Sequence, residues 1–231
     1  MATWHAKTTG AYGYTSNEAK DNAEMFYGVM YSLGWCLEAV CAALGNQAGE
    51  SGYNPWRWGS DDVLASDSQW IDTREPIPGT SPQRYYNHAY GLFQQDPAGK
   101  YLHRQYAMSL STYAPNYSNQ QGQPHDGDAQ CRYLHWICSD PNGGEWDSDT
   151  SHSTYNMPYS SFYTNSQNRS VEYLTHTFFK GYERGTWDNV RVTQANYWYN
   201  YLGGITPPTP PTPPTPTGRK LPIFFYLRYP F

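Results

Sequence analysis

Residues 44–55 read Leu44-Gly45-Asn46-Gln47-Ala48-Gly49-Glu50-Ser51-Gly52-Tyr53-Asn54-Pro55, and this stretch decides how the rest of the chain is interpreted. The residues before it, from Trp35 to Leu44, are apolar and rich in alanine, which predicts a buried helix. That helix runs into a glycine-bracketed turn with one carboxylate, Glu50. The stretch therefore places a single acid at the end of a core helix.

A carboxyl group in that position is suited to proton donation. Apolar neighbours disfavour its ionised form, so we expect the pKa of Glu50 to rise toward the range in which it can act as a general acid near neutral pH. The alternative is a surface glutamate in a loop that ends a helix, because lone acids in loops are common. These twelve residues alone do not separate the two interpretations.

Composition excludes several classes of protein. The chain has 231 residues, enough for one domain with a hydrophobic core, with or without an appendage. A net charge of −5 with only 15% charged residues argues against a surface for nucleic acid or for anionic membranes. We find no run of apolar residues long enough to span a membrane, and the N-terminus predicts no signal peptide.

The aromatic content is unusually high. Nine Trp and 23 Tyr contribute most of the 17% aromatic residues, so many rings must be partly exposed. Flat apolar faces with a polar group suit stacking on sugar rings. A stiff, Tyr-rich structural protein is the alternative, and the two interpretations are compatible.

The cysteines predict neither a metal site nor a cofactor. Cys36, Cys41, Cys131 and Cys138 show no C-x-x-C spacing, and no histidine lies at a ligand interval from them. We therefore expect buried free thiols.

Four segments follow one another along the chain. A polar arm (1–14) precedes the main domain (15–204), a Thr/Pro-rich linker of polyproline II type (205–218) and an apolar C-terminal peptide (219–231). Residues Leu221–Phe231 are too few to form a core or to cross a bilayer, so we expect them to dock on a partner protein. A tail without function is the alternative.

Hydrophobic periodicity predicts six helices in the main domain. They cover residues 17–33, with Ser16 or Asn17 as the cap and Gly34 as the end, and residues 35–44, 98–110, 128–137, 171–184 and 190–202.

Two segments between these helices lack helical periodicity. Residues 55–82 are irregular, which is unusual in a compact domain and favours a functional loop or cleft wall, with Trp56, Trp58 and Trp70 as candidates for stacking on sugars. Residues 85–95 predict a short extended element, in which Gly91 marks close approach of a ligand or another part of the chain.

Several motifs together resemble a known superfamily. Glu50-Ser51 and Asn54-Pro55, followed about forty residues later by Tyr90-Gly91-Leu92-Phe93-Gln94, resemble lysozyme-like proteins, in which E-S-x-x-N-P ends a helix and G-L-x-Q faces it across a cleft. Over about residues 15–202 the order of motifs is similar to the bacteriophage tail lysozyme family. The additional motifs are Gly45-Asn46, Gly91 to Ala98, Tyr173-Leu174, Phe178, Tyr182-Glu183-Arg184, Arg191, Ala195 and Trp198-Tyr199.

The resemblance implies a mainly α, lysozyme-like α+β fold, in which a small irregular or β lobe faces the end of the catalytic helix. It further implies a glycosidase that cleaves peptidoglycan between N-acetylmuramic acid and N-acetylglucosamine. The enzyme would be carried at the tail or tail tip of a phage virion, with peptidoglycan and other tail proteins as partners, and would be made in the host cytoplasm. A lytic transglycosylase stays open, and a lysozyme-fold structural or wall-binding protein with little or no activity is the alternative.

For the site, the resemblance implies Glu50 as the catalytic acid. Tyr90 and Gln94 would position sugar substituents, and Trp56 or Trp58 would stack on a sugar. The other expected substrate contacts are Ser51, Asn54, Gly91 and Gln95. Two departures from the family pattern are Gln95, where the family has tryptophan, and Glu183-Arg184-Gly185, where it has E-R-P.

The second catalytic carboxylate stays open at this point. Glu183 and Asp96 are the candidates, and Asp61, Asp62, Asp67 and Asp72 lie in the irregular loop. For Glu183, an ion pair with Arg184 or Arg191 is the competing interpretation. For Asp96, it is a helix N-cap beside Pro97.

Overall fold

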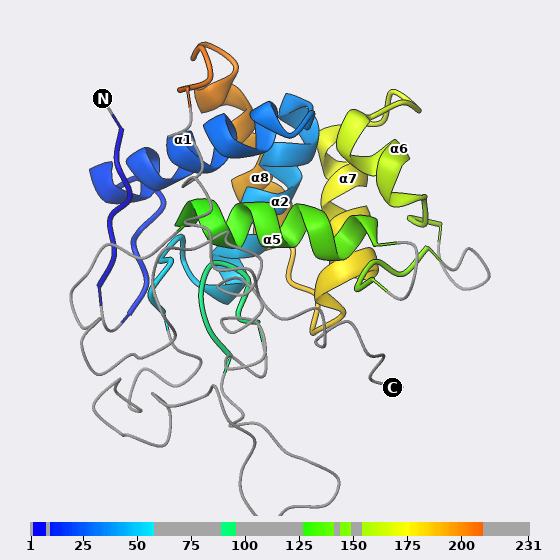
Figure 1. Ribbon diagram of the computed structural model, residues 1–231, viewed down its shortest axis with the longest axis horizontal. Coiled ribbons are helices and arrows are strands. Elements are labelled where there is room, and N and C mark those ends of the chain that lie inside the picture. Colours follow the sequence, from blue (N-terminus) through cyan, green and yellow to red (C-terminus); the bar gives the residue numbers. More distant parts are fainter. Residues whose placement is uncertain are drawn as a thin grey trace, which may run out of the picture.

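The computed structural model describes residues 2–7, 10–57, 89–95, 127–140, 144–148 and 154–209. They form the helices α1 (Asn17–Ser32), α2 (Leu37–Glu50), α5 (Gly127–Ser139), α6 (Tyr159–Thr164), α7 (Val171–Phe178) and α8 (Val190–Leu202), and the π-helical turn η2 (Phe179–Glu183). α2 is central, because it contacts α1, α6, α7 and α8, while α5 packs on α1 and α6 (Figure 1).

This architecture confirms the expectation of a mainly α domain. Within the described ranges there is no strand, and Tyr90 and Gln95 form an isolated antiparallel bridge. Most of the expected irregular or β lobe lies outside the described residues, as do the helix expected over 98–110 and the segment 210–231. None of the helices described here is both long and apolar enough to cross a membrane.

α1 forms as its sequence predicts. The Ser16 hydroxyl caps the helix by accepting a hydrogen bond from the Ala19 amide at 3.1 Å. Gly34 follows the helix with φ of 89°, a conformation that favours glycine. The apolar stripe of α1, which includes Phe26 and Met30, is fully buried.

α2 is longer than its sequence predicts. It starts after Cys36, which acts as the N-cap, and it continues to Glu50 instead of ending at Leu44. Glycine inside a helix lowers stability by about 0.5–1 kcal/mol relative to alanine. For that reason we expected the helix to end before Gly45 and Gly49. Tertiary packing overrides that cost, because α2 and α8 approach closely where these glycines lack side chains.

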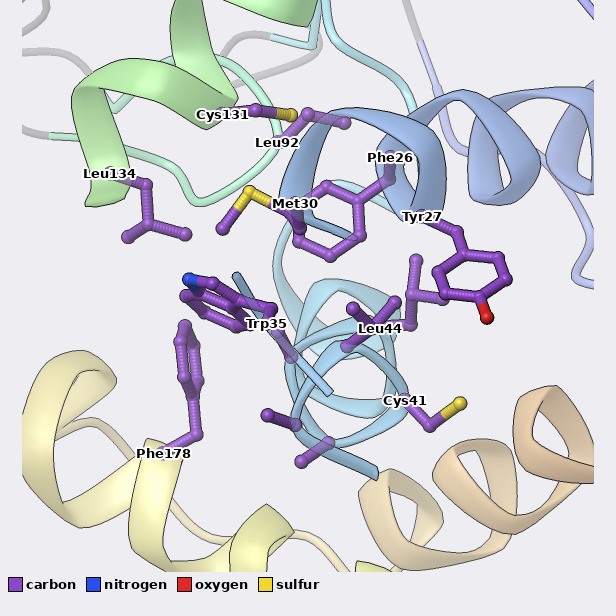
Figure 2. Close-up of a cluster of buried hydrophobic side chains, with 14 of the residues drawn as sticks. Phe26, Tyr27, Met30, Trp35, Cys41, Leu44, Leu92, Cys131, Leu134 and Phe178 are labelled. Atoms are coloured by element: carbon purple, nitrogen blue, oxygen red, sulfur yellow. The ribbon is translucent and has the colours of Figure 1, made fainter. Parts of the chain in front are cut away.

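The aromatic core is centred on Trp35, which lies just before α2. Its ring makes edge contacts with the Phe26 and Phe178 rings (Figure 2). It also meets the Phe162 ring, with 5.4 Å between the centroids. Phe93, from the segment 89–95, lies 5.6 Å from the Phe178 ring. That segment is therefore anchored in the helical core by its apolar residues.

The four cysteines fit the expectation of free thiols. All four are unbridged; Cys41, Cys131 and Cys138 are buried, and Cys36 is partly exposed.

The C-terminal half departs from the prediction in two places. α6 was not predicted, and the single helix expected over 171–184 is α7 followed by the π-helical turn η2. A Cβ on Gly181 would lie 2.8 Å from the Trp146 ring, so the widened turn leaves room for that indole. Arg184, in the left-handed conformation with φ of 56°, ends the turn.

Both ends of the domain are held against it. The N-terminal arm is bound by Asn22, whose Nδ2 donates to the His5 carbonyl at 2.8 Å, and by Asp128, which accepts from the Trp4 indole at 2.7 Å. At the other end, a Cβ on Gly28 of α1 would lie 3.2 Å from the Pro208 carbonyl carbon. The first residues of the Pro-rich segment therefore lie against α1.

Replacing Gly45 with alanine should destabilise the domain by about 1–3 kcal/mol, as overpacking usually does. The new methyl would lie 2.7 Å from the Ala195 Cβ and would also meet the Arg191 carbonyl oxygen, which outweighs the gain in helix propensity. Urea unfolding measures the change. Gly204→Ala is the control, since no heavy atom lies within 4 Å of a Cβ there. Equal stability of Gly45→Ala and the wild type would contradict the close packing of α2 on α8.

Candidate active site

Glu50 is the last residue of α2, and its side chain is bound to a guanidinium. Oε1 of Glu50 lies 2.7 Å from Nη2 of Arg191, which comes from the first turn of α8. The Glu50 side chain is 22% exposed, and that of Arg191 is 6% exposed. The expectation that apolar neighbours surround Glu50 is therefore wrong, since a buried cation lies directly against it.

Arg191 is held by several contacts besides Glu50. Its Nη1 donates to the carbonyl oxygen of Asn46 at 2.9 Å, and its Cζ lies 5.1 Å from the centre of the Phe179 ring. A Cβ on Gly49 would lie 2.9 Å from that Cζ. The guanidinium is thus seated between the last turn of α2 and the start of η2, in space that only a glycine at position 49 leaves open.

The sequence around Arg191 contains a signal for its role. Arg191 shares one face of α8 with Ala195, Trp198 and Leu202, and all four are buried. Arginine is almost never fully buried without a partner, so its place in an apolar stripe indicates a carboxylate opposite it. The sequence offers Arg191 as a candidate partner of Glu183, whereas the structure pairs it with Glu50.

Arg57 connects Glu50 to the segment 90–95, a role that none of the sequence motifs predicted. Its Nη1 donates to the Glu50 carbonyl oxygen at 3.1 Å. Its own carbonyl oxygen accepts from the Gly91 amide at 2.9 Å and from Nε2 of Gln94 at 3.1 Å. One residue therefore links the end of α2 to the 90–95 segment.

Residues 90–95 form a tight turn and not the extended element that we expected. Tyr90 and Gln95 exchange backbone hydrogen bonds of 3.1 and 2.8 Å, and the chain between them reverses. Gly91 has φ of 79°, and a Cβ there would lie 2.9 Å from Cδ of Gln130. The close approach predicted at Gly91 is therefore made by a side chain of α5, which also binds the Leu92 amide at 2.8 Å.

Six of the eight expected substrate contacts are buried, including Gly91 and Gln95 of the turn. Ser51, Asn54 and Trp56 are fully buried and Tyr90 is 1% exposed. Asn54 Nδ2 donates to the carbonyl oxygens of Lys7 and Gly10, both at 2.9 Å, and the rings of Trp56 and Tyr90 pack edge to face at 5.6 Å. In this structure these side chains hold the fold, and no face of the Trp56 ring is open to a sugar.

Gln94 is the partly exposed side chain of the turn, beside Arg57, whereas Gln95 is nearly buried and donates to the Tyr182 hydroxyl at 3.0 Å. The turn thereby reaches η2 as well as α2. Trp58 and Asp96 lie outside the described residues, as do the four loop aspartates. Within the described ranges, no three His, Cys, Asp or Glu side chains converge as metal ligands would.

Glu183 ends η2 with its carboxyl directed inward. Among the described residues, its buried Oε1 has no hydrogen-bond partner. Burial raises the pKa of Glu183 well above the usual range for glutamate, the charge of Glu50 raises it further, and Arg191 opposes both. The ion pair expected with Arg184 or Arg191 is not found, because Arg184 lies 3.4 Å from Glu145 and Arg191 is bound to Glu50.

The raised pKa of Glu183 predicts that its contribution to stability is lost as pH increases. Below about pH 4.5, the usual glutamate pKa, Glu183 is protonated in both the folded and the unfolded state. Above that pH only the folded state keeps the proton, so unfolding releases it. The free energy of unfolding therefore decreases as pH rises toward the pKa of Glu183 in the folded state. Denaturant unfolding from about pH 4 to about pH 9 should therefore show a decline that Glu183→Gln lacks. The exposed Glu172→Gln should keep the decline. Parallel curves for wild type and Glu183→Gln would rule out a buried proton.

Comparisons with known proteins agree with this geometry. The chain is 27% identical over 186 residues to Morphogenesis protein 1 of Bacillus phage B103, an alignment that covers 79% of this chain and 40% of that protein. The chain therefore spans well under half the length of this relative. The sequence model of the phage tail lysozyme family matches residues 21–202, which include Glu50, the 90–95 turn and Arg191. The chain belongs to the phage tail lysozyme family.

Proposed function

We propose that this protein is a peptidoglycan-cleaving glycosidase of a phage virion, which acts between N-acetylmuramic acid and N-acetylglucosamine. Glu50 would deliver the proton to the leaving glycosidic oxygen. The observation that carries the proposal is a partly exposed carboxyl fixed at the end of a core helix, beside the 90–95 turn, in a member of this family.

The rigidity of the site supports catalysis. Arg191 is fixed to the backbone of α2 at Asn46, and the turn is fixed through Arg57 and the buried side chain of Gln130. Catalytic groups need to be held within a fraction of an ångström of their working position, and such second contacts provide that. Gln94, partly exposed on the turn, would bind a substituent of the sugar. A water molecule or a hydroxyl of the substrate itself would then complete hydrolysis or transglycosylation.

A second candidate function is structural. The Arg191 guanidinium binds Oε1 of Glu50 at 2.7 Å, as in a structural ion pair. The relative from Bacillus phage B103 is named for morphogenesis. Both observations fit a lysozyme-fold component of the particle that binds the cell wall with little or no cleavage.

The apolar C-terminal peptide, Leu221–Phe231, would dock this domain on another virion protein. An apolar peptide on a polyproline spacer needs a surface to cover it. Because Pro208 lies against Gly28 of α1, the spacer leaves the domain from a fixed point on α1.

Replacing Glu50 with Gln removes the proton while it keeps the shape of the side chain. We expect the rate at which wall suspensions clear to fall by a factor of about 10²–10⁴, the usual contribution of a general acid. Glu172→Gln, an exposed glutamate on α7, is the matched control and should clear walls at the wild-type rate. Equal clearing by Glu50→Gln would exclude the catalytic role of Glu50. If neither Glu50→Gln nor the wild type clears walls and both bind them, the structural candidate is correct. Reducing or anhydro ends on the fragments distinguish hydrolysis from transglycosylation.

Deleting Leu221–Phe231 should abolish incorporation into the particle and leave the activity of the purified protein unchanged. The peptide is expected to contact only its partner, so the catalytic domain should not be affected. Particle composition and wall clearing measure the two effects separately. Normal incorporation of the truncated protein would exclude the docking role.

A further inference from the structure

The ion pair between Glu50 and Arg191 raises a question about the proposed chemistry. A general acid must carry a proton, yet Oε1 of Glu50 lies 2.7 Å from a guanidinium nitrogen, and a guanidinium has only hydrogen-bond donors. Proton donation by Glu50 therefore requires a second arrangement, in which Glu50 is protonated and Arg191 is bound elsewhere. The structure contains a group that fits this requirement.

That group is Glu183. Its Oε1 is buried and has no hydrogen-bond partner within the described part of the chain, while the neighbouring Arg184 is turned outward, where its Nη2 donates to the Glu145 carbonyl at 2.7 Å. An ionised carboxylate without a partner is far more costly to bury than a neutral carboxyl. With Arg191 bound to Glu50, Glu183 therefore holds a proton.

Arg191 has an unused donor in the same region. Its Nε is buried and has no acceptor among the described residues, just as Oε1 of Glu183 has no donor. Phe179, the first residue of the turn that ends at Glu183, lies against the guanidinium with its ring centre 5.1 Å from Cζ. A donor without an acceptor and an acceptor without a donor thus lie on neighbouring elements, and the charge of Arg191 acts on the Glu183 carboxyl.

We propose that Arg191 is a positioning residue shared by Glu50 and Glu183, and that these two carboxyls carry one proton between them. The proton resides on Glu183 while Arg191 is bound to Glu50. It resides on Glu50 when Arg191 is bound to Glu183, which is the arrangement that donates to substrate. The proposal rests on the proposed function for its catalytic consequence, but the shared proton itself is a property of the free protein.

The exchange is balanced in charge. In both arrangements the three groups comprise one carboxylate, one neutral carboxyl and one guanidinium, so only a proton moves and the net charge stays zero. After donation to the leaving oxygen, hydrolysis returns a proton from the attacking water to the site.

The other charged and titratable groups near the two carboxyls leave this balance intact. Arg57 binds the backbone oxygen of Glu50 at 3.1 Å, and Glu145 lies 3.4 Å from Arg184. Cys138 of α5 faces Glu183, and burial raises the pKa of its thiol, which keeps it neutral. Arg191 is the cation that pairs with the Glu50 side chain.

Carbon-13 NMR of glutamate carboxyls in the full chain tests the shared proton without an activity assay. In the wild type, Glu50 and Glu183 should titrate in two coupled steps. In Glu183→Gln no second carboxyl shares the proton, so the Glu50 signal should follow a single step and lose the upper of the two wild-type steps. Glu183→Met, which is also neutral, should give the same single step if the amide disturbs the fold. Glu172→Gln should keep both steps. A Glu50 signal that follows only one step in the wild type would overturn the proposal.

Wall clearing as a function of pH tests the catalytic consequence. Glu183→Gln should lower the rate near neutral pH by about tenfold or more and move the optimum to lower pH, because Glu50 then holds its proton only in more acidic solution. A purely structural Glu183 would change the rate at every pH and leave the optimum in place, and that result would also overturn the proposal. Inactivity of the wild type at every pH would instead refute the proposed function, and the NMR titration would still decide whether the proton is shared.

Discussion

The close packing of α2 against α8 is the constraint on which the rest of the site depends. Gly45 lets the backbone of α8 approach, and Gly49 leaves the space that the Arg191 guanidinium occupies. That guanidinium in turn binds the backbone of Asn46 and the carboxyl of Glu50. Glycine, which disfavours helix, is tolerated twice within five residues because the packing it permits places the Arg191 charge against the candidate acid.

Around this contact, apolar side chains anchor the 90–95 turn in the core, and polar side chains bind it to the neighbouring helices. Leu92 and Phe93 fix the 90–95 turn in the core, and Arg57 and Gln95 bind its backbone and side chains to α2 and η2. The site is thereby assembled from four segments that are far apart in the sequence, and each is held by the core and not by the substrate. Such preorganisation is what a glycosidase needs, since its acid must meet the leaving oxygen without rearrangement of the scaffold.

The electrostatics of the site follow from how cations and carboxyls are paired among the described residues. Glu50 and Glu183 lie near the buried guanidinium of Arg191, Arg57 binds the Glu50 backbone, and Arg184 is occupied by Glu145 on the surface. One carboxyl can be paired, and the other must be neutral because an unpaired buried charge is too costly. The structure gives the cation to Glu50, and it leaves Glu183 as the carboxyl with a raised pKa. Stability and the proposed catalysis thus depend on the same three groups.

The sequence by itself determined the helices whose signals are local and the acid that ends the core helix. Periodicity was sufficient for α1, α5 and α8, with a side-chain cap at α1, and the order of motifs placed the chain in its family, whereas α6 and the π-helical turn η2 were not predicted. Only the tertiary structure decided that α2 continues through Gly45 and Gly49 to Glu50, that Trp56 and Asn54 are buried, and that Arg191 binds Glu50 and not Glu183. The physical reason is that packing decides both outcomes. Whether α2 continues through its glycines, and which carboxylate Arg191 binds, depends on contacts between α2 and α8, whose residues are more than a hundred positions apart in the sequence.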